Sequence, residues 1–87
     1  MRADFDEMLV KVSEAEGVTP TEVLGPRRYH PLPFVRRVFI ECLLRSGWTG
    51  MEIARESGWW PQVVYDLKRN PNYQRILSDA DTIMEAA

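Results

Sequence analysis

The segment GMEIARESGWWPQVVYDLKRN, residues 50–70, carries the pattern that decides the fold. Two helices packed steeply across a short turn need a small residue inside the first helix, and Ala54 supplies it. The turn needs a residue that tolerates a positive φ, and Gly58 follows four residues later. Val64 comes ten residues after Ala54 and gives the second helix its apolar face. These offsets predict a helix-turn-helix over about residues 49–69, a motif that also occurs in proteins that do not bind DNA.

Apolar residues recur at helical spacing in three further segments, and no segment alternates as a strand does. The stripes are Phe5, Met8, Leu9 and Val12; Val35, Val38, Phe39, Cys42 and Leu43; and Tyr73, Ile76, Leu77, Ala80, Ile83 and Met84. The last stripe predicts a C-terminal helix over about residues 72–86. With 87 residues, the chain is expected to form a single all-α domain, residues 1–87, a small helical bundle of about five to six helices.

Cap and turn residues divide the chain between these helices. Thr19 and Glu22 have capping-box spacing, and the proline after Thr19 suits the first helical position, so a short helix is expected there. Residues 24–33 contain three prolines and a glycine, which predicts a loop whose basic part is residues 26–33. A long helix is then expected from Phe34 onward.

Charge is distributed unevenly along the chain. The formal net charge is −2, which argues against a basic coat over the whole surface. Residues 26–48 nevertheless hold five arginines against one glutamate, whereas residues 1–25 hold two basic residues against six acidic ones. A local patch attracts an anionic partner even on a slightly acidic protein, and guanidinium groups match phosphates bidentately. The middle of the chain is therefore the expected phosphate-contacting surface.

Four arginines of this region are candidates for contacts with a DNA backbone and minor groove. Arg27 and Arg28 lie in the proline-bounded loop, from which arginines can enter a narrow minor groove. Arg36 and Arg37 stand near the start of the long helix, where the helix dipole disfavours cations and a nearby anion would stabilise them. Ordinary solvation of a polar loop and helix start is the alternative interpretation.

The second helix of the motif holds the candidates for the major groove. Gln62, Tyr65 and Arg69 fall on its expected outer face. Gln62 can pair with adenine, Arg69 can contact guanine or a phosphate, and Tyr65 can bond a phosphate or touch a thymine methyl group. The alternative is a solvated helix face with an internal pair between Asp66 and Arg69.

The adjacent Trp59 and Trp60 are too large for both to be fully buried in so small a domain. One is expected in the core and the other at a partner surface, rather than as a wedge between bases. The outer face described above follows if Trp60 points to the core together with Val63, Val64 and Leu67.

The order of the segments VSEAEGVTPTEVLG, PRRYHPLPFVRRVFIECLLR and TGMEIARESG resembles the C-terminal DNA-binding domain of the bacterial replication initiator DnaA, over roughly residues 8–69. In that family an arginine-rich loop reaches the minor groove, and a helix-turn-helix places its recognition helix in the major groove. The resemblance implies that Arg27 and Arg28 lie in the basic loop. It also implies that Arg37, or Arg36 in a shifted alignment, meets a phosphate.

The chain departs from this family at the recognition helix. The family's Gly-Arg-Asp-His-Thr-Thr-Val signature is absent, because the chain reads GWWPQVVYDL over residues 58–67. A Gly-rich ATP-binding loop is also absent. The resemblance therefore implies a bacterial or phage-derived transcription regulator, with a fold of the DnaA C-terminal or Trp-repressor kind and a rewritten DNA specificity.

Residues that would carry catalysis are not evident, so an enzyme is not expected. His30 is the only histidine, Cys42 lies on an apolar stripe as a buried thiol would, and no cluster has metal-ligand spacing. We expect no catalytic residue, metal or cofactor. The sequence shows neither a signal peptide nor an apolar run of about 20 residues, so no membrane partner is expected, and a cytoplasmic, nucleoid-associated location is.

Double-stranded DNA is thus the expected partner, and the function is that of a DNA-binding transcriptional regulator domain. A further partner from the transcription or replication machinery and a homodimer are both compatible with the sequence. The alternative function is a protein-interaction or packaging-type adaptor that uses the helix-turn-helix fold without specific DNA binding. The arginine patch discriminates the two, because an adaptor tolerates its removal.

Overall fold

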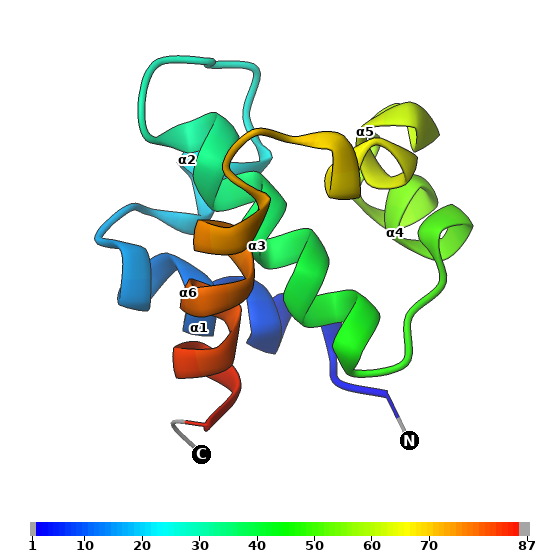
Figure 1. Cartoon of the computed structure of the whole chain (residues 1–87), viewed down its shortest axis with the longest axis horizontal. Helices are drawn as coiled ribbons and strands as arrows, with labels where there is room; N and C mark the ends of the chain where they lie inside the picture. The colour runs from blue at the N-terminus through cyan, green and yellow to red at the C-terminus, as the bar shows by residue number, and fades with distance from the viewer. Residues whose placement is uncertain (1, 86–87) are drawn as a thin grey trace.

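A computed structural model describes residues 2–85, which form six α-helices and one 3-10 turn, with no strand among them. The elements are α1 (Phe5–Glu16), α2 (Pro20–Leu24), α3 (Leu32–Arg45), α4 (Gly50–Ser57), α5 (Pro61–Tyr65), η1 (Leu67–Arg69) and α6 (Tyr73–Glu85). Figure 1 shows α3 crossing the middle of the molecule, with α1, α2 and α6 on one side and α4 and α5 on the other. The expected all-α helical bundle is confirmed.

The core is built around α3, which packs against α1, α2, α4 and α6. Every residue of its predicted stripe is buried, and so are the four stripe residues of α1. Ile40 lies outside that stripe but is also fully buried, because neighbouring helices cover α3 from several sides. Phe39 meets Phe5 edge to face, with ring centroids 5.1 Å apart. Burying a side chain of this size contributes about 1.5–3 kcal/mol, so α3 is the main source of stability.

Cap residues fix where several helices begin and end, and the capping box predicted at Thr19 is confirmed. Thr19 and Thr49 each close a capping box with the glutamate three residues later, which satisfies backbone N–H groups that begin α2 and α4. Gly17 ends α1 in the left-handed region. These local contacts fix where α2 and α4 begin, and hence where the chain leaves the core on either side of α3.

Two predicted boundaries are wrong. α3 begins at Leu32 rather than Phe34, because a proline in the first helical turn lacks only an N–H that would have no partner there. The second helix of the motif predicted over residues 49–69 is shorter than expected: α5 ends at Tyr65, and η1 follows after Asp66. The predicted C-terminal helix is confirmed as α6, within residues 73–85, and residue 86 lies outside the described range. Over the described part of the chain, no helix is both long and apolar enough to cross a membrane.

Candidate nucleic-acid interface

The helix-turn-helix segment consists of α4, a turn at residues 58–60 and α5. Gly58 has φ +78°, a conformation that side chains other than glycine rarely adopt. Gly50 allows α5 to approach α4 closely, because a Cβ atom there would lie 3.2 Å from Val64 Cγ1 and 3.3 Å from Tyr65 Cε1. Ala54 and Val64 are both buried, as their spacing predicts.

The two adjacent tryptophans have opposite environments. Trp59 is half-buried and meets Phe39 edge to face, with ring centroids 6.1 Å apart and an interplanar angle of 90°. Trp60 is 80% exposed. Trp59 is therefore the tryptophan that packs against the core, and the condition that Trp60 faces the core does not hold. The reason is local: Pro61 is the first residue of α5, so Trp60 precedes the helix with extended backbone and does not lie on its inner face.

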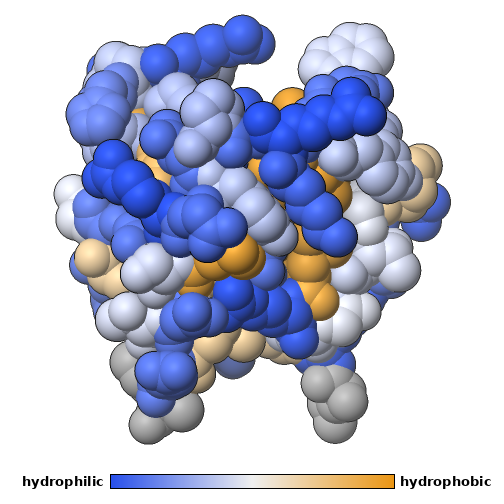
Figure 2. Space-filling model, viewed as in Figure 1, coloured by the Kyte–Doolittle hydropathy of each residue, from blue (hydrophilic) through white to orange (hydrophobic). Residues whose placement is uncertain are grey.

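A groove of about 700 Å³ separates the loop between α2 and α3 from the turn between α4 and α5. Figure 2, in the same view as Figure 1, shows the surface hollowed at the top between these two parts. The groove is lined by Leu24, Gly25, Pro26, Arg28, Pro33, Arg36, Arg37, Ser57, Gly58, Trp59, Trp60 and Val63. None of these lining residues is acidic, although the chain has more acidic than basic residues. Hereafter this hollow is called the groove.

Arg36 is bound to the fold by three hydrogen bonds. Its Nε donates to Val23 O at 2.7 Å, and its Nη2 donates to Glu22 O at 3.0 Å and to Gly25 O at 2.7 Å. These bonds fasten α3 to the end of α2 and to the loop that follows. Burial lowers the pKa of Arg36, and the nearby charges of Arg28 and Arg37 lower it further. The three guanidinium groups thus form a cluster of like charge.

Arg27, Arg28 and Arg37 have no ion-pair partner among residues 2–85; the ion pairs found there all involve Arg2 or Arg45. Arg37 uses Nη1 to donate to Pro33 O at 2.9 Å and keeps its other donors. Arg28 and Arg37 line the groove, whereas Arg27 is exposed on the loop outside it.

The carboxylate nearest the loop is that of Glu22, and its oxygens are already occupied. Oε2 accepts from the Tyr29 hydroxyl at 2.6 Å, and Oε1 accepts from the Thr19 backbone at 3.0 Å. The pKa of Glu22 is lowered first by the Tyr29 bond, then by Thr19, with a smaller contribution from the charge of Arg27. Glu22 therefore serves the capping box of α2 and fixes the loop at Tyr29.

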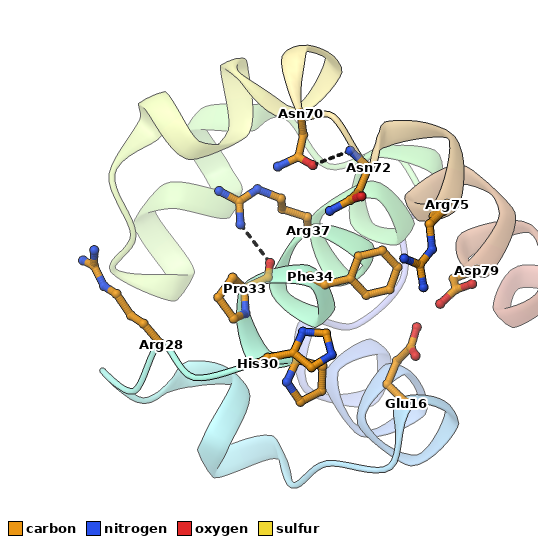
Figure 3. Close-up of a pocket in the computed structure, with 11 residues that line it drawn as sticks. Glu16, Arg28, His30, Pro33, Phe34, Arg37, Asn70, Asn72, Arg75 and Asp79 are labelled. Carbon is orange, nitrogen blue, oxygen red and sulfur yellow. Dashed lines mark hydrogen bonds between the residues drawn. The ribbon is translucent and has the colours of Figure 1, made fainter.

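A second hollow, of about 440 Å³, lies on the other side of Arg28 and Arg37 and is called the polar pocket. Figure 3 shows Arg75 and the carboxyl groups of Glu16 and Asp79 on one side of it, and Arg28 on the opposite side. Burial raises the pKa of Glu16 to about 7, and the hydrogen bond and charge of Asp79 raise it too. Glu16 Oε1 is buried and receives no hydrogen bond from a described donor, so a proton shared with Asp79 would satisfy it.

The residues expected to enter the major groove lie on the outer surface of α5 and η1. Gln62, Tyr65 and Arg69 are exposed, and none of them lines the groove. Gln62 Nε2 donates to Asp66 Oδ1 at 2.9 Å. An ion pair between Asp66 and Arg69 is not among those found in the described residues. The structure thus brings Arg28, Arg36 and Arg37 together and places the α5 candidates apart from them.

Trp60 and the groove are the features that sequence reasoning missed. The proline after Trp60 is a signal that this tryptophan precedes the helix, and it could have corrected the orientation of Trp60. The groove itself has no local signal, because its lining comes from residues 24–37 and residues 57–63, which lie far apart in the sequence.

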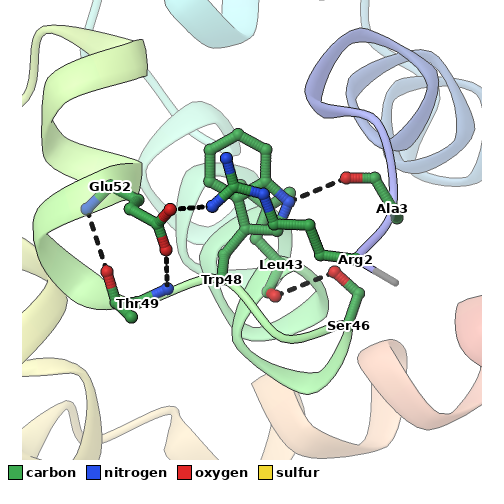
Figure 4. Close-up of polar contacts among 7 residues, drawn as sticks. All are labelled: Arg2, Ala3, Leu43, Ser46, Trp48, Thr49 and Glu52. Carbon is green, nitrogen blue, oxygen red and sulfur yellow. Dashed lines mark hydrogen bonds and ion pairs between the residues drawn. The ribbon is translucent and has the colours of Figure 1, made fainter.

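Around Trp48, in contrast, the polar groups satisfy one another, as Figure 4 shows. The Trp48 indole N–H donates to Ala3 O at 2.8 Å. The Arg2 guanidinium lies over the same indole, 4.0 Å from the ring centroid, and forms an ion pair with Glu52. Glu52 Oε1 also accepts from the Thr49 N–H at 3.0 Å. Arg2 and Glu52 form an ion pair here, whereas the arginines that line the groove have no ion-pair partner among residues 2–85.

Within the described residues, no group of three or more His, Cys, Asp and Glu side chains could hold a metal ion. Burial raises the pKa of the Cys42 thiol to about 12, which keeps it from ionising near neutral pH. The chain matches no protein-family model, no curated protein sequence and no solved structure.

Proposed function

We propose that this protein is a DNA-binding domain of a transcription regulator, which contacts duplex DNA through the loop before α3 and through α5. Under this proposal the domain is similar to the C-terminal domain of DnaA, and Arg27 and Arg28 lie in its basic loop. Arg37 would bind a phosphate, and Gln62, Tyr65 and Arg69 would face base edges or the backbone.

One observation carries the proposal: the groove is lined by three arginines and by no acidic residue, in a chain of net charge −2. A cluster of like charges costs stability unless an anion offsets the repulsion. Acidic side chains elsewhere in the chain form ion pairs with Arg2 and Arg45 and close the capping boxes of α2 and α4. An anionic backbone along the α2–α3 loop is the partner that this arrangement fits best.

Binding to a fluorescent duplex of random sequence, followed by anisotropy across a salt series, tests the proposal. We expect an affinity that falls steeply with salt, because bound phosphates release counterions. Replacing Arg27 and Arg28 together with alanine should reduce the slope of the log–log plot by about two units, one for each lost phosphate contact. Lys11→Ala removes a charge from α1 and should leave the slope unchanged. Absence of binding at low salt would refute the proposal.

A second candidate is a protein-interaction module, and the surface of α4 and α5 favours it. Met51, Trp60 and Tyr65 are large apolar or aromatic side chains exposed on that surface. Such residues are typical of the centre of a protein interface. In this case the affinity for a captured protein partner would be reduced by Trp60→Ala and unchanged by loss of Arg27 and Arg28.

A further inference from the structure

Trp60 is an aromatic platform presented to solvent at the rim of the groove. It precedes α5 as the N-cap residue, with φ −65° and ψ 135°, and no side-chain cap bond involves it. Folding leaves 80% of it exposed, although an indole is among the most stabilising groups to bury. A single exposed apolar residue is ordinary on a protein surface, and Trp60 differs from such residues in what surrounds it.

The backbone that carries Trp60 is held on both sides. The preceding Trp59 packs edge-on against Phe39, and the backbone N–H of Trp59 donates to Ser57 Oγ at 3.1 Å. The following residue is Pro61, whose ring fixes φ. The Trp60 carbonyl accepts from the Val63 N–H at 3.1 Å, which ties Trp60 to the first turn of α5. An aromatic side chain has only two torsions, so it loses little conformational entropy when a partner stacks on it.

The opposite side of the groove is cationic. Arg28 and Arg37 line it and have no ion-pair partner among the described residues, and Arg36 stands beside them with its donors turned to backbone carbonyls. The polar pocket next to it contains the carboxyl groups of Glu16 and Asp79, which would repel a phosphate. Arg28 and Arg37 line both hollows, and Phe34 and Arg75 also line the polar pocket. Of the two, the groove is the one that combines these arginines with a largely exposed indole and a lining without acidic residues.

We propose that the groove binds an unpaired nucleotide of DNA, with the base stacked on Trp60 and the adjacent phosphates bound by Arg28 and Arg37. The inference rests on the proposed function and makes its substrate narrower: DNA that is single-stranded, or opened at one base. A basic groove combined with a stacking aromatic residue is the arrangement that recognises single strands.

The geometry favours an unpaired base over an intact duplex. Bases in a duplex present their edges in the grooves and hide their faces in the stack, so an indole can stack only on a base that has left it. The volume of about 700 Å³ falls in the range of about 300–1,000 Å³ that is usual for small-molecule sites, and it is enough for a nucleotide. The duplex contacts proposed for Gln62, Tyr65 and Arg69 lie outside the groove, so the two modes of binding are separable.

Anisotropy with the full chain tests this inference, using a labelled thymidine oligonucleotide of about 15 nucleotides and a duplex of equal length at low salt. We expect Trp60→Ala to weaken binding of the single strand roughly five- to a hundredfold, as loss of one stacked base predicts, and to leave duplex binding unchanged. Trp60→Phe should retain most of the affinity. Val10→Ala removes an exposed apolar side chain of α1 that does not line the groove, and it should not affect the single strand. Circular dichroism establishes that each variant is folded.

The outcomes separate this inference from the proposed function. If the duplex binds and the single strand does not, or if Trp60→Ala binds the single strand as tightly as the unmodified chain, the inference is wrong and the proposed function stands. An equal loss for both forms of DNA would also overturn it, because Trp60 would then be a general contact. Failure of both forms to bind would refute the proposed function together with the inference.

Discussion

The arginines at the two ends of α3 differ in whether they form ion pairs. At the C-terminal end, Arg2 is paired with Glu52 and stacked on Trp48, and Arg45 donates to Glu41 Oε2 at 2.8 Å and pairs with Asp81. At the N-terminal end, the arginines of the groove have no carboxylate partner among residues 2–85. The first region is complete within the chain, whereas the second lacks its counter-charge.

Under the proposed function, the paired end serves the fold and the end without ion pairs serves an anionic partner. Surface ion pairs contribute little to stability. The paired end is informative mainly because its cations already have carboxylate partners within the chain. An unpaired cluster has a cost that selection for stability alone would not retain, and an anionic partner would relieve it.

The largest difference should separate the tryptophans Trp48 and Trp60. Trp48 is 7% exposed, bonded to Ala3 O and in contact with Phe5 at 5.6 Å between ring centroids. Trp48→Ala should lower the free energy of unfolding by about 3–5 kcal/mol, since it removes a buried aromatic group. Trp60→Ala should change it by less than about 0.5 kcal/mol. Urea denaturation followed by circular dichroism measures both, and a similar loss for the two variants would contradict the division into two regions.

Adjacent Arg36 and Arg37 should differ next, because they stand at the boundary between structural and free arginines. Arg36→Ala removes three hydrogen bonds to backbone carbonyls, and we expect a loss of about 2–3 kcal/mol in the free energy of unfolding. Arg37→Ala loses one bond to Pro33 O in the helix turn before it, and a change within about 0.5 kcal/mol is expected.

DNA affinity should show the reverse order when both variants are measured at a temperature where they are folded. Arg37→Ala should weaken binding to the duplex and reduce the salt slope by about one unit. The Arg36→Lys variant keeps the charge but not the three-bond geometry, so it should bind DNA nearly as well while remaining less stable. A weaker effect of Arg37→Ala than of Arg36→Lys on affinity would reverse the roles assigned here.

Much of the fold could be predicted because its signals are local. Helical spacing identified the stripes of α1, α3 and α6, and the capping box at Thr19 identified where α2 begins. These features depend on residues three or four positions apart, which the sequence displays directly. The helix-turn-helix offsets are also short, and Gly58 has the positive φ that they require.

The candidate site was less predictable because it joins segments distant in the chain. Arg28 and Trp60 line one groove although 31 positions lie between them in numbering, and only the packing on α3 brings them together. The position of Arg36 near a helix start predicts a phosphate contact, but its hydrogen bonds depend on how the α2–α3 loop curves back over α3. Periodicity does not encode that curvature.

A smaller effect is expected from Glu16, which lies beside the groove in the polar pocket. Its pKa of about 7 exceeds the ordinary 4.5, so the folded protein holds this proton more tightly than the unfolded chain does. The stability that comes from this tighter binding of the Glu16 proton is complete below about pH 4.5. It falls as the pH rises to about 7 and is absent above that pH. Because solvent screens this partly exposed group, we expect Glu16→Gln to stabilise the protein by about 1 kcal/mol at pH 8 and not at pH 4.

Thermal denaturation at several pH values measures the effect of Glu16→Gln. In an Asp79→Asn background the gain should shrink, because the hydrogen bond and charge of Asp79 no longer raise the pKa and only burial remains. An equal gain at pH 4 and pH 8 would mean that packing, and not the proton, is responsible.

The smallest effects should come from salt, and their signs should be opposite at the two ends of α3. Glu52→Gln keeps an oxygen that accepts from the Thr49 N–H but loses the charge that pairs with Arg2, so it should destabilise the fold at low salt and have little effect at high salt. Arg28→Ala relieves repulsion within the cluster and should stabilise the fold, by at most about 0.5 kcal/mol at low salt. Denaturation at 50 mM and 500 mM sodium chloride, about 14 Å and 4 Å of screening length, compares them. If Arg28→Ala destabilised the protein at low salt, Arg28 would have a partner within the fold, and the contrast between the two ends would be lost.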